Sequence, residues 1–286
     1  MESQEPAESV KPMPFIDKLT NIFASPGELF ENVRETGPTN SNWLVPWMIY
    51  VAISIATGQF VLSNASLSSQ LERTVRDQFE KSMEQGIREG SVTREQADQQ
   101  FEQFAKPGST WFTLLSTGGT LLGSLAFLFG DSLFFLLVSA VIPSKSPTPI
   151  LKDFLFEVSG NTFTITATNL LGKLASASYM KVVEVIGLTF LIGSLERVVT
   201  TALMFATDSI NTSTSLALLL SKVDLENKLH VAFSKLDVFT FWEIVVTSIG
   251  LSAIFQKDFP KVLVLVIALW ILWTLLSILI GLNIAG

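Results

Sequence analysis

The residue types on which metal sites and many nucleophilic mechanisms depend are nearly absent from this 286-residue chain. The chain has one histidine, His230, and no cysteine. A zinc site needs several His or Cys ligands, and a Ser–His–Asp triad needs a histidine with defined partners, so a lone histidine supports neither. The lack of cysteine excludes disulfides and thiol catalysis. We therefore expect no enzyme activity, no catalytic residue, no metal site and no cofactor.

Five ionisable residues lie within long apolar runs, and four of them are the candidates for membrane-buried charges: Asp131, Glu196, Arg197 and Glu243. The fifth, Glu184, lies near the start of its run. A charge inside a bilayer is costly, so such residues either pair with one another or line a path for protons or ions. Both alternatives stay open. Counted from the midpoints of their apolar runs, Arg197 and Glu243 share a depth to within one residue, about 1.5 Å of helix rise. We predict that these two pair, because Glu196 points about 100° away from Arg197 on the same helix.

The composition indicates a membrane protein that crosses the bilayer several times. Hydrophobic residues make up 48% of the chain and charged residues 16%, with a mean hydropathy of +0.46. A soluble domain carries about 25% charged residues. The net charge of −7 gives no reason to expect a nucleic-acid partner. We expect the partners to be the lipid bilayer and other membrane proteins.

Five apolar runs are long enough to cross a bilayer, which takes about 20 helical residues. They are Leu44–Leu62, Trp111–Ile142, Val182–Ala206, Val238–Phe255 and Val262–Leu282. The second is longer than the bilayer requires, so it must tilt, kink or project from the membrane. The predicted fold is therefore all-α, a polytopic bundle of five transmembrane helices. Between the second and third runs, the alternating residues Asn161–Thr168 fit a strand or, equally, a membrane-surface helix or loop.

An amphipathic segment precedes the first run. Its apolar residues fall on one helical face, which either lies on the membrane or packs beneath the protein's own bundle. These residues are Phe15, Ile16, Leu19, Ile22 and Phe23. Ser25 and Glu28 then predict a capping box that starts a second short helix, with Pro26 at its first position.

A polar segment, 64–108, separates the first two runs and reads as a helical hairpin outside the bilayer. Gly90 breaks its periodicity, and Thr93 with Gln96 predicts a capping box for its second helix. The hairpin either binds a partner or is a self-packed spacer. The whole chain divides into a disordered segment 1–12, amphipathic cytoplasmic helices 13–42, a first span 43–63, the hairpin 64–108 and a four-span membrane domain 109–286.

Two motifs accompany the five spans. Ser25-Pro-Gly-Glu-Leu-Phe30 lies before the first span, and Asp237-x-Phe239-x-x-Trp242 lies at the start of the fourth, with Gly250-Leu251 behind it. In these features the chain resembles the bacterial branch of the Yip family, the five-span membrane proteins that interact with Ypt and Rab GTPases. The resemblance covers most of residues 15–283. For the bacterial branch it implies a fold and a membrane location, and no defined activity. We expect a non-enzymatic membrane scaffold or assembly factor in the bacterial inner membrane.

The family pattern is not complete. Eukaryotic relatives carry an Asp-Leu-Tyr-Gly-Pro string that this chain lacks, and the third run has Gly187-Leu188 where a Gly-Tyr pair is typical. A Rab-type GTPase partner is therefore doubtful. The alternative function is a small transporter or channel that uses Arg197, Glu196 and Glu243.

The distribution of lysine and arginine predicts the topology. Once the hairpin is set aside, these residues are more frequent in the segments on the side of the N-terminus, which places the N-terminus inside and the C-terminus outside. Reporter fusions after residues 105, 146, 212 and 284 should therefore read outside, inside, outside and outside. An inside signal at residue 284 would overturn either the number of spans or the orientation.

Overall fold

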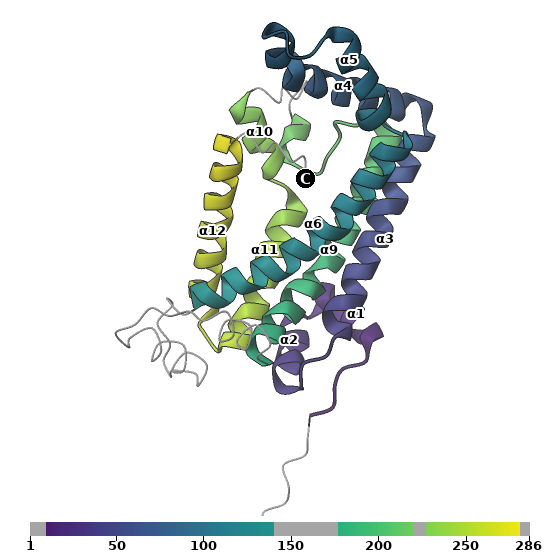
Figure 1. Cartoon of the computed structure of the whole chain (residues 1–286). Helices are drawn as coiled ribbons and strands as arrows, with labels where there is room; N and C mark the ends of the chain where they lie inside the picture. Colours follow the sequence, from purple (N-terminus) through teal and green to yellow (C-terminus); the bar gives the residue numbers. More distant parts are fainter. Residues whose placement is uncertain (1–9, 140–176, 220–226, 281–286) are drawn as a thin grey trace, which may run out of the picture. The chain divides into compact units, whose positions relative to one another are not determined.

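The computed structural model describes residues 10–139, 177–219 and 227–280, and every regular element among them is a helix (Figure 1). The predicted all-α class is therefore confirmed. The N-terminal half contains α1 Phe15–Ala24, α2 Pro26–Glu35, α3 Ser41–Ser63, α4 Ala65–Arg88, α5 Arg94–Gln100, the π-helix η1 Phe101–Ala105 and α6 Thr110–Ser139. The C-terminal half contains α9 Ala177–Thr207, the 3-10 helix η2 Leu216–Leu219, α10 Lys228–Lys235, α11 Val238–Phe255 and α12 Phe259–Ile280. The segment Asn161–Thr168 lies outside the described residues.

Four of these helices are long and apolar enough to cross a membrane. They are α3, α6 over Thr110–Val138, α11, and α12 over Phe259–Ile278. They match the first, second, fourth and fifth predicted runs. The third run forms part of α9, a helix of 31 residues that is not among the four. The chain therefore has the pattern of a multi-pass membrane protein.

Several helices extend beyond the predicted runs: α3 begins at Ser41 and α9 at Ala177, before the predicted starts. The helix α12 begins at Phe259, three residues before the predicted start, because Pro260 falls in the first turn, where its missing N–H group breaks no helical hydrogen bond.

The two N-terminal helices share a boundary residue. Ser25 is the N-cap residue of α2 and Pro26 its first helical residue, as predicted, but the capping box with Glu28 is not formed. Ser25 is also the C-cap of α1, and its N–H donates to the Asn21 carbonyl oxygen at 2.9 Å. One residue thus ends one helix and starts the next, and its side chain makes no cap hydrogen bond.

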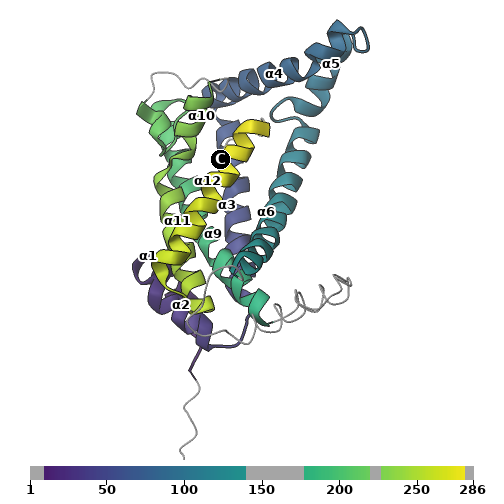
Figure 2. The ribbon, with the colours of Figure 1, turned by 90° about the vertical axis from the view of Figure 1, so that its left-hand side faces the viewer.

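The predicted hairpin is formed by α4, α5 and η1 (Figure 2). Gly90 follows α4 with a φ of 72°, a left-handed conformation that favours glycine. The Thr93–Gln96 capping box is confirmed, because each residue's side chain bonds the other's backbone N–H. At the base of α4, the amide of Gln70 bonds both the Asp208 carbonyl oxygen and the Ile210 N–H. These bonds fix the start of α4 on the turn after α9.

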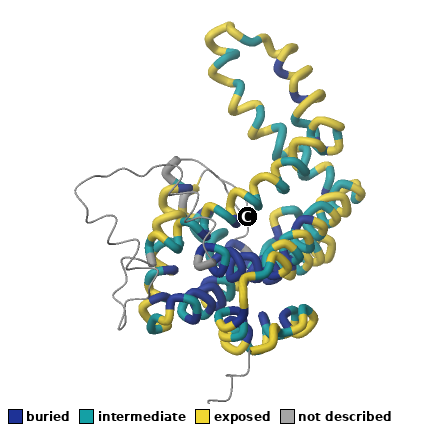
Figure 3. The backbone as a smooth tube through the Cα atoms, turned by 60° about the horizontal axis from the view of Figure 1, so that its bottom comes forward, coloured by how far each residue is buried: buried dark blue, intermediate teal, exposed yellow. Residues whose placement is uncertain are grey.

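The chain divides into two compact units. Unit 1 contains Met1–Met48, Phe127–Ile192 and Thr240–Leu282, and unit 2 contains Ile49–Ala126, Gly193–Phe239 and Asn283–Gly286. The core of unit 1 is the first half of α9, where every residue from 181 to 192 is buried (Figure 3, dark blue). A helix buried on all sides must be apolar all round or have its polar groups paired.

Glycines allow α9 to pack closely within unit 1. A Cβ atom at Gly187 would overlap the backbone Cα atom of Trp43 at the start of α3. A Cβ atom at Gly250 of α11 would lie 2.5 Å from a methyl carbon of Val185. These two positions therefore accept no side chain without movement of a neighbouring helix.

Substitution of Gly187 tests this packing. Gly187→Ala should lower the free energy of unfolding by about 1–3 kcal/mol, because the added methyl group forces α3 and α9 apart. The measurement is thermal unfolding in detergent or nanodiscs, followed by circular dichroism. Gly118→Ala in α6 is the matched control, since nothing lies within 4 Å of its Cβ position. Equal stability of the two variants would contradict the close α3–α9 contact.

Candidate functional site

A buried group of charged and polar residues joins three helices of unit 1. It consists of Lys18 on α1, Asn42 on α3, and Lys181 and Glu184 on α9, and we refer to these four residues as the polar cluster. None of the four is more than 8% exposed, and Glu184 is fully buried. Charged side chains are almost never buried to this degree unless they are paired.

Glu184 is the centre of the polar cluster. Its Oε1 atom accepts three hydrogen bonds, from the Thr39 N–H at 2.5 Å, the Thr39 hydroxyl at 3.3 Å and the Asn42 amide at 2.9 Å. Its Oε2 atom lies 3.0 Å from Lys181 Nζ. That contact is an ion pair without hydrogen-bond geometry, so Oε2 has no hydrogen-bond donor. The carboxylate is therefore fully enclosed by protein groups.

The two lysines connect Glu184 to the N-terminal helices. Lys181 donates to the carbonyl oxygen of Val33 in the last turn of α2, and Lys18 donates to Asn42 Oδ1 at 2.6 Å. Burial lowers the pKa of Lys18, Glu184 opposes this effect, and Lys181 adds to it. Since two cations share one anion, the polar cluster has an excess positive charge.

The sequence indicated only part of this arrangement. Lys181 and Glu184 are spaced i, i+3 at the start of an apolar helix, which places them on one face. That spacing was the available signal for a structural pair. Nothing local links them to Lys18 or Asn42, because the Asn42–Glu184 hydrogen bond spans 142 residues of sequence.

The four charged residues singled out from the sequence lie elsewhere. Glu196 and Arg197 are half-buried on the second half of α9, where Arg197 and Asp237 are the charges that act on Glu196. Asp131 is half-buried on α6. Arg197 belongs to unit 2 and Glu243 to unit 1, so their predicted pairing stays a prediction.

The motif Asp237-x-Phe239-x-x-Trp242, on which the family resemblance rests, takes part in contacts within the protein. Asp237 caps α11, because its Oδ1 accepts from the Phe239 N–H at 2.8 Å, and its other oxygen accepts from the Thr214 hydroxyl. Asp237 and Phe239 are both buried. The ring of Trp242 packs edge-on against Phe23 of α1, with centroids 5.4 Å apart.

The amphipathic stripe of α1 is divided between buried and exposed positions. Ile22 is fully buried, Phe23 contacts Trp242, and Phe15 and Leu19 are half-buried. Ile16 is 68% exposed. Most of the stripe therefore packs on protein, and Ile16 is the position that remains open to lipid or to a partner.

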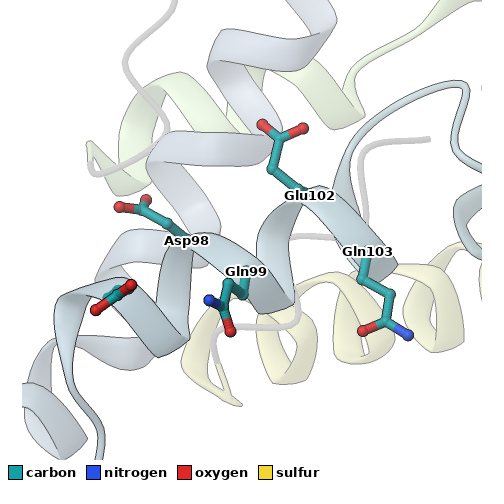
Figure 4. A pocket seen from close by; sticks show the side chains of 5 residues that line it. Asp98, Gln99, Glu102 and Gln103 are labelled. Atoms are coloured by element: carbon teal, nitrogen blue, oxygen red, sulfur yellow. The ribbon is translucent and has the colours of Figure 1, made fainter.

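A shallow hollow on the hairpin is lined by polar side chains (Figure 4). They are Glu95, Asp98, Gln99, Glu102 and Gln103. Two of the carboxylates already have cations: Arg76 lies 3.6 Å from Asp98 and 3.1 Å from Glu102, and Lys106 lies 2.7 Å from Glu102. The hydrogen bond from Lys106 lowers the pKa of Glu102. Among the described residues, no group of His, Cys, Asp or Glu is arranged to hold a metal ion.

Comparison with known proteins adds no relative. No family model matches the chain, and neither a curated protein nor a solved structure matches it.

The charge balance of the polar cluster predicts unequal effects of two substitutions. Glu184→Gln should lower the free energy of unfolding by about 3–5 kcal/mol, because it leaves two buried lysines without an anion. Lys18→Met should cost only about 1 kcal/mol, the loss of one hydrogen bond, since a neutral Lys181–Glu184 pair remains. Chemical or thermal unfolding of the purified protein in nanodiscs measures both.

The pH dependence of stability provides a second measurement. Since the pKa of Lys18 is lowered in the folded protein, the unfolded chain binds more protons between that lowered value and 10.5. Wild-type stability should therefore rise with pH across this window, and Lys18→Met should lack this rise. A Lys18→Met variant that is less stable than Glu184→Gln would refute the assigned charge balance.

Proposed function

We propose that this chain is a non-enzymatic, multi-pass membrane scaffold of the Yip type, which organises lipids and other membrane proteins in the bacterial cytoplasmic membrane. In this proposal α9 is a fifth span. The N-terminus is cytoplasmic, and the C-terminus and the hairpin are outside. A GTPase partner is not part of the proposal.

The observation that carries the proposal is the complete burial of the Glu184 carboxylate among protein groups. This carboxylate has no exposed surface, and its two oxygens face Thr39, Asn42 and Lys181. A group that passes protons or ions along a path must reach water or substrate. Glu184 instead connects surface helices to a membrane helix, which is the role of a structural tie.

A further point supports a scaffold. In the amphipathic pair, α1 is bonded to α3 through Lys18 and Asn42, and α2 is bonded to α9 through the Val33 carbonyl and Lys181. Ile16 of α1 remains exposed, and the polar side chains that line the hollow of the hairpin are accessible as well. Rigidly held helices with exposed positions on both segments are suited to contacts with other molecules.

The alternative, a small transporter or channel, rests on the half-buried Glu196 and Arg197. These two residues carry opposite charges on one helix, and they belong to a different unit from the polar cluster. They are therefore the residues whose substitution would separate the two functions.

Two measurements test the proposed function. A photo-crosslinking amino acid at the exposed positions Ile16 and Gln103 should give discrete protein adducts in cells. The same group at Leu122, which is 72% exposed on α6, should give lipid adducts and serves as the control. Purified protein in liposomes should show no saturable solute flux. Saturable flux that Arg197→Leu abolishes, without protein adducts at either position, would establish the alternative.

A further inference from the structure

Two aromatic side chains form an exposed pair where the hairpin joins α6. Phe104 lies on η1 and Trp111 is the second residue of α6. Their ring centroids are 5.9 Å apart with an angle of 47° between the planes. Phe104 is 41% exposed and Trp111 is 48% exposed, and we refer to the two as the aromatic pair.

The π-helical turn explains why Phe104 faces outward. In an α-helix, residues three apart are only about 60° apart around the axis, so Phe104 would follow Phe101 into the hairpin. Here the Lys106 N–H donates to the Phe101 carbonyl at 2.8 Å, which closes the wider i, i+5 turn. Phe101 is 1% exposed and packs on Phe79 with centroids 5.6 Å apart, whereas Phe104 reaches Trp111.

Arg76 holds the inner ring in place. Its guanidinium carbon lies 4.0 Å from the centroid of the Phe101 ring, and the same group pairs with Asp98 and Glu102. Polar contacts therefore gather on the Arg76 side of the segment. The wide turn thus gives η1 a polar side and an aromatic side.

The aromatic side continues the exposed apolar surface of a membrane helix. Immediately after Trp111, α6 exposes Leu114 at 58% and Leu115 at 61%. A tryptophan at the end of a span lies at the level of the lipid headgroups, because its ring is apolar and its N–H group is polar. Since Phe104 contacts Trp111, it lies at the same level.

We propose that the aromatic pair docks into the headgroup layer of the bilayer and thereby holds the end of the hairpin, residues 101–106, on the membrane surface. The inference rests on the proposed membrane function and adds a lipid contact for a segment outside the spans. Lipid is the occupant because the exposed apolar surface that begins at Phe104 is continuous with that of α6.

The absence of cysteine from the chain allows a direct test. Single variants Phe104→Cys, Gln103→Cys and Leu122→Cys are labelled with a nitroxide in liposomes of phosphatidylethanolamine and phosphatidylglycerol. Collision with oxygen and with a water-soluble nickel chelate then reports depth. We expect the label at 104 to collide more with oxygen and less with the nickel chelate than the label at 103, which is exposed on the same turn. The label at 122 should favour oxygen most strongly.

The three positions separate the possible failures. A label at 122 that is accessible to nickel would remove the membrane assignment on which the proposed function rests. A label at 122 within the bilayer, together with equal nickel accessibility at 103 and 104, would overturn only the docking of the aromatic pair.

A second variant does not depend on a label at the pair itself. Phe104→Ser with Trp111→Ser should lose amide hydrogen-exchange protection over residues 101–106 in liposomes. Gln99→Ser with Gln103→Ser, which alters exposed polar residues of the hollow, should keep that protection. Unchanged exchange in the aromatic variant would also overturn the docking.

Discussion

The buried carboxylate of Glu184 is the constraint on which the organisation of unit 1 depends. An ionised group without exposed surface is tolerated only when donors and cations surround it. Asn42 in the first turn of α3 and Thr39 just before α3 supply donors, and Lys181, on α9 like Glu184 itself, supplies a cation. Because Lys181 also bonds the end of α2, and Lys18 bonds Asn42, meeting this one requirement fixes three further helices against α9.

Close packing and charge pairing act together at this point. Gly187 lies one turn beyond Glu184, and its lack of a side chain allows α9 to contact α3 at Trp43. That approach brings Asn42, the residue before Trp43, within 2.9 Å of the carboxylate. A larger residue at Gly187 would move α3 away and lengthen this hydrogen bond, so the packing and the polar cluster depend on each other.

The sequence predicted those features that depend on neighbouring residues. Hydropathy alone gave the bounds of α11, and the Thr93–Gln96 pair gave the start of α5, since each depends on a few consecutive residues. The Ser25 capping box failed because Ser25 also ends α1. The polar cluster was missed because its members come from separate helices: the Lys18–Asn42 bond spans 24 residues of sequence and the Asn42–Glu184 bond spans 142. Helix periodicity carries no information about such pairs. The outward orientation of Phe104 could likewise not be predicted from hydrophobic periodicity, because the residue composition of a π-helical turn does not distinguish it from an α-helix.

The full burial of residues 181 to 192 has a consequence for biosynthesis. The residues that enclose this half of α9 include Lys18 and Asn42, which leave the ribosome well over a hundred residues earlier. During synthesis these polar groups have no anion to contact until Glu184 has been made. Unit 1 therefore cannot mature helix by helix in chain order. Its core is complete only after α9 and the later α11 have been made, because Gly250 of α11 packs on Val185 of α9. The N-terminal helices therefore lack their final contacts while the first half of the protein is translated.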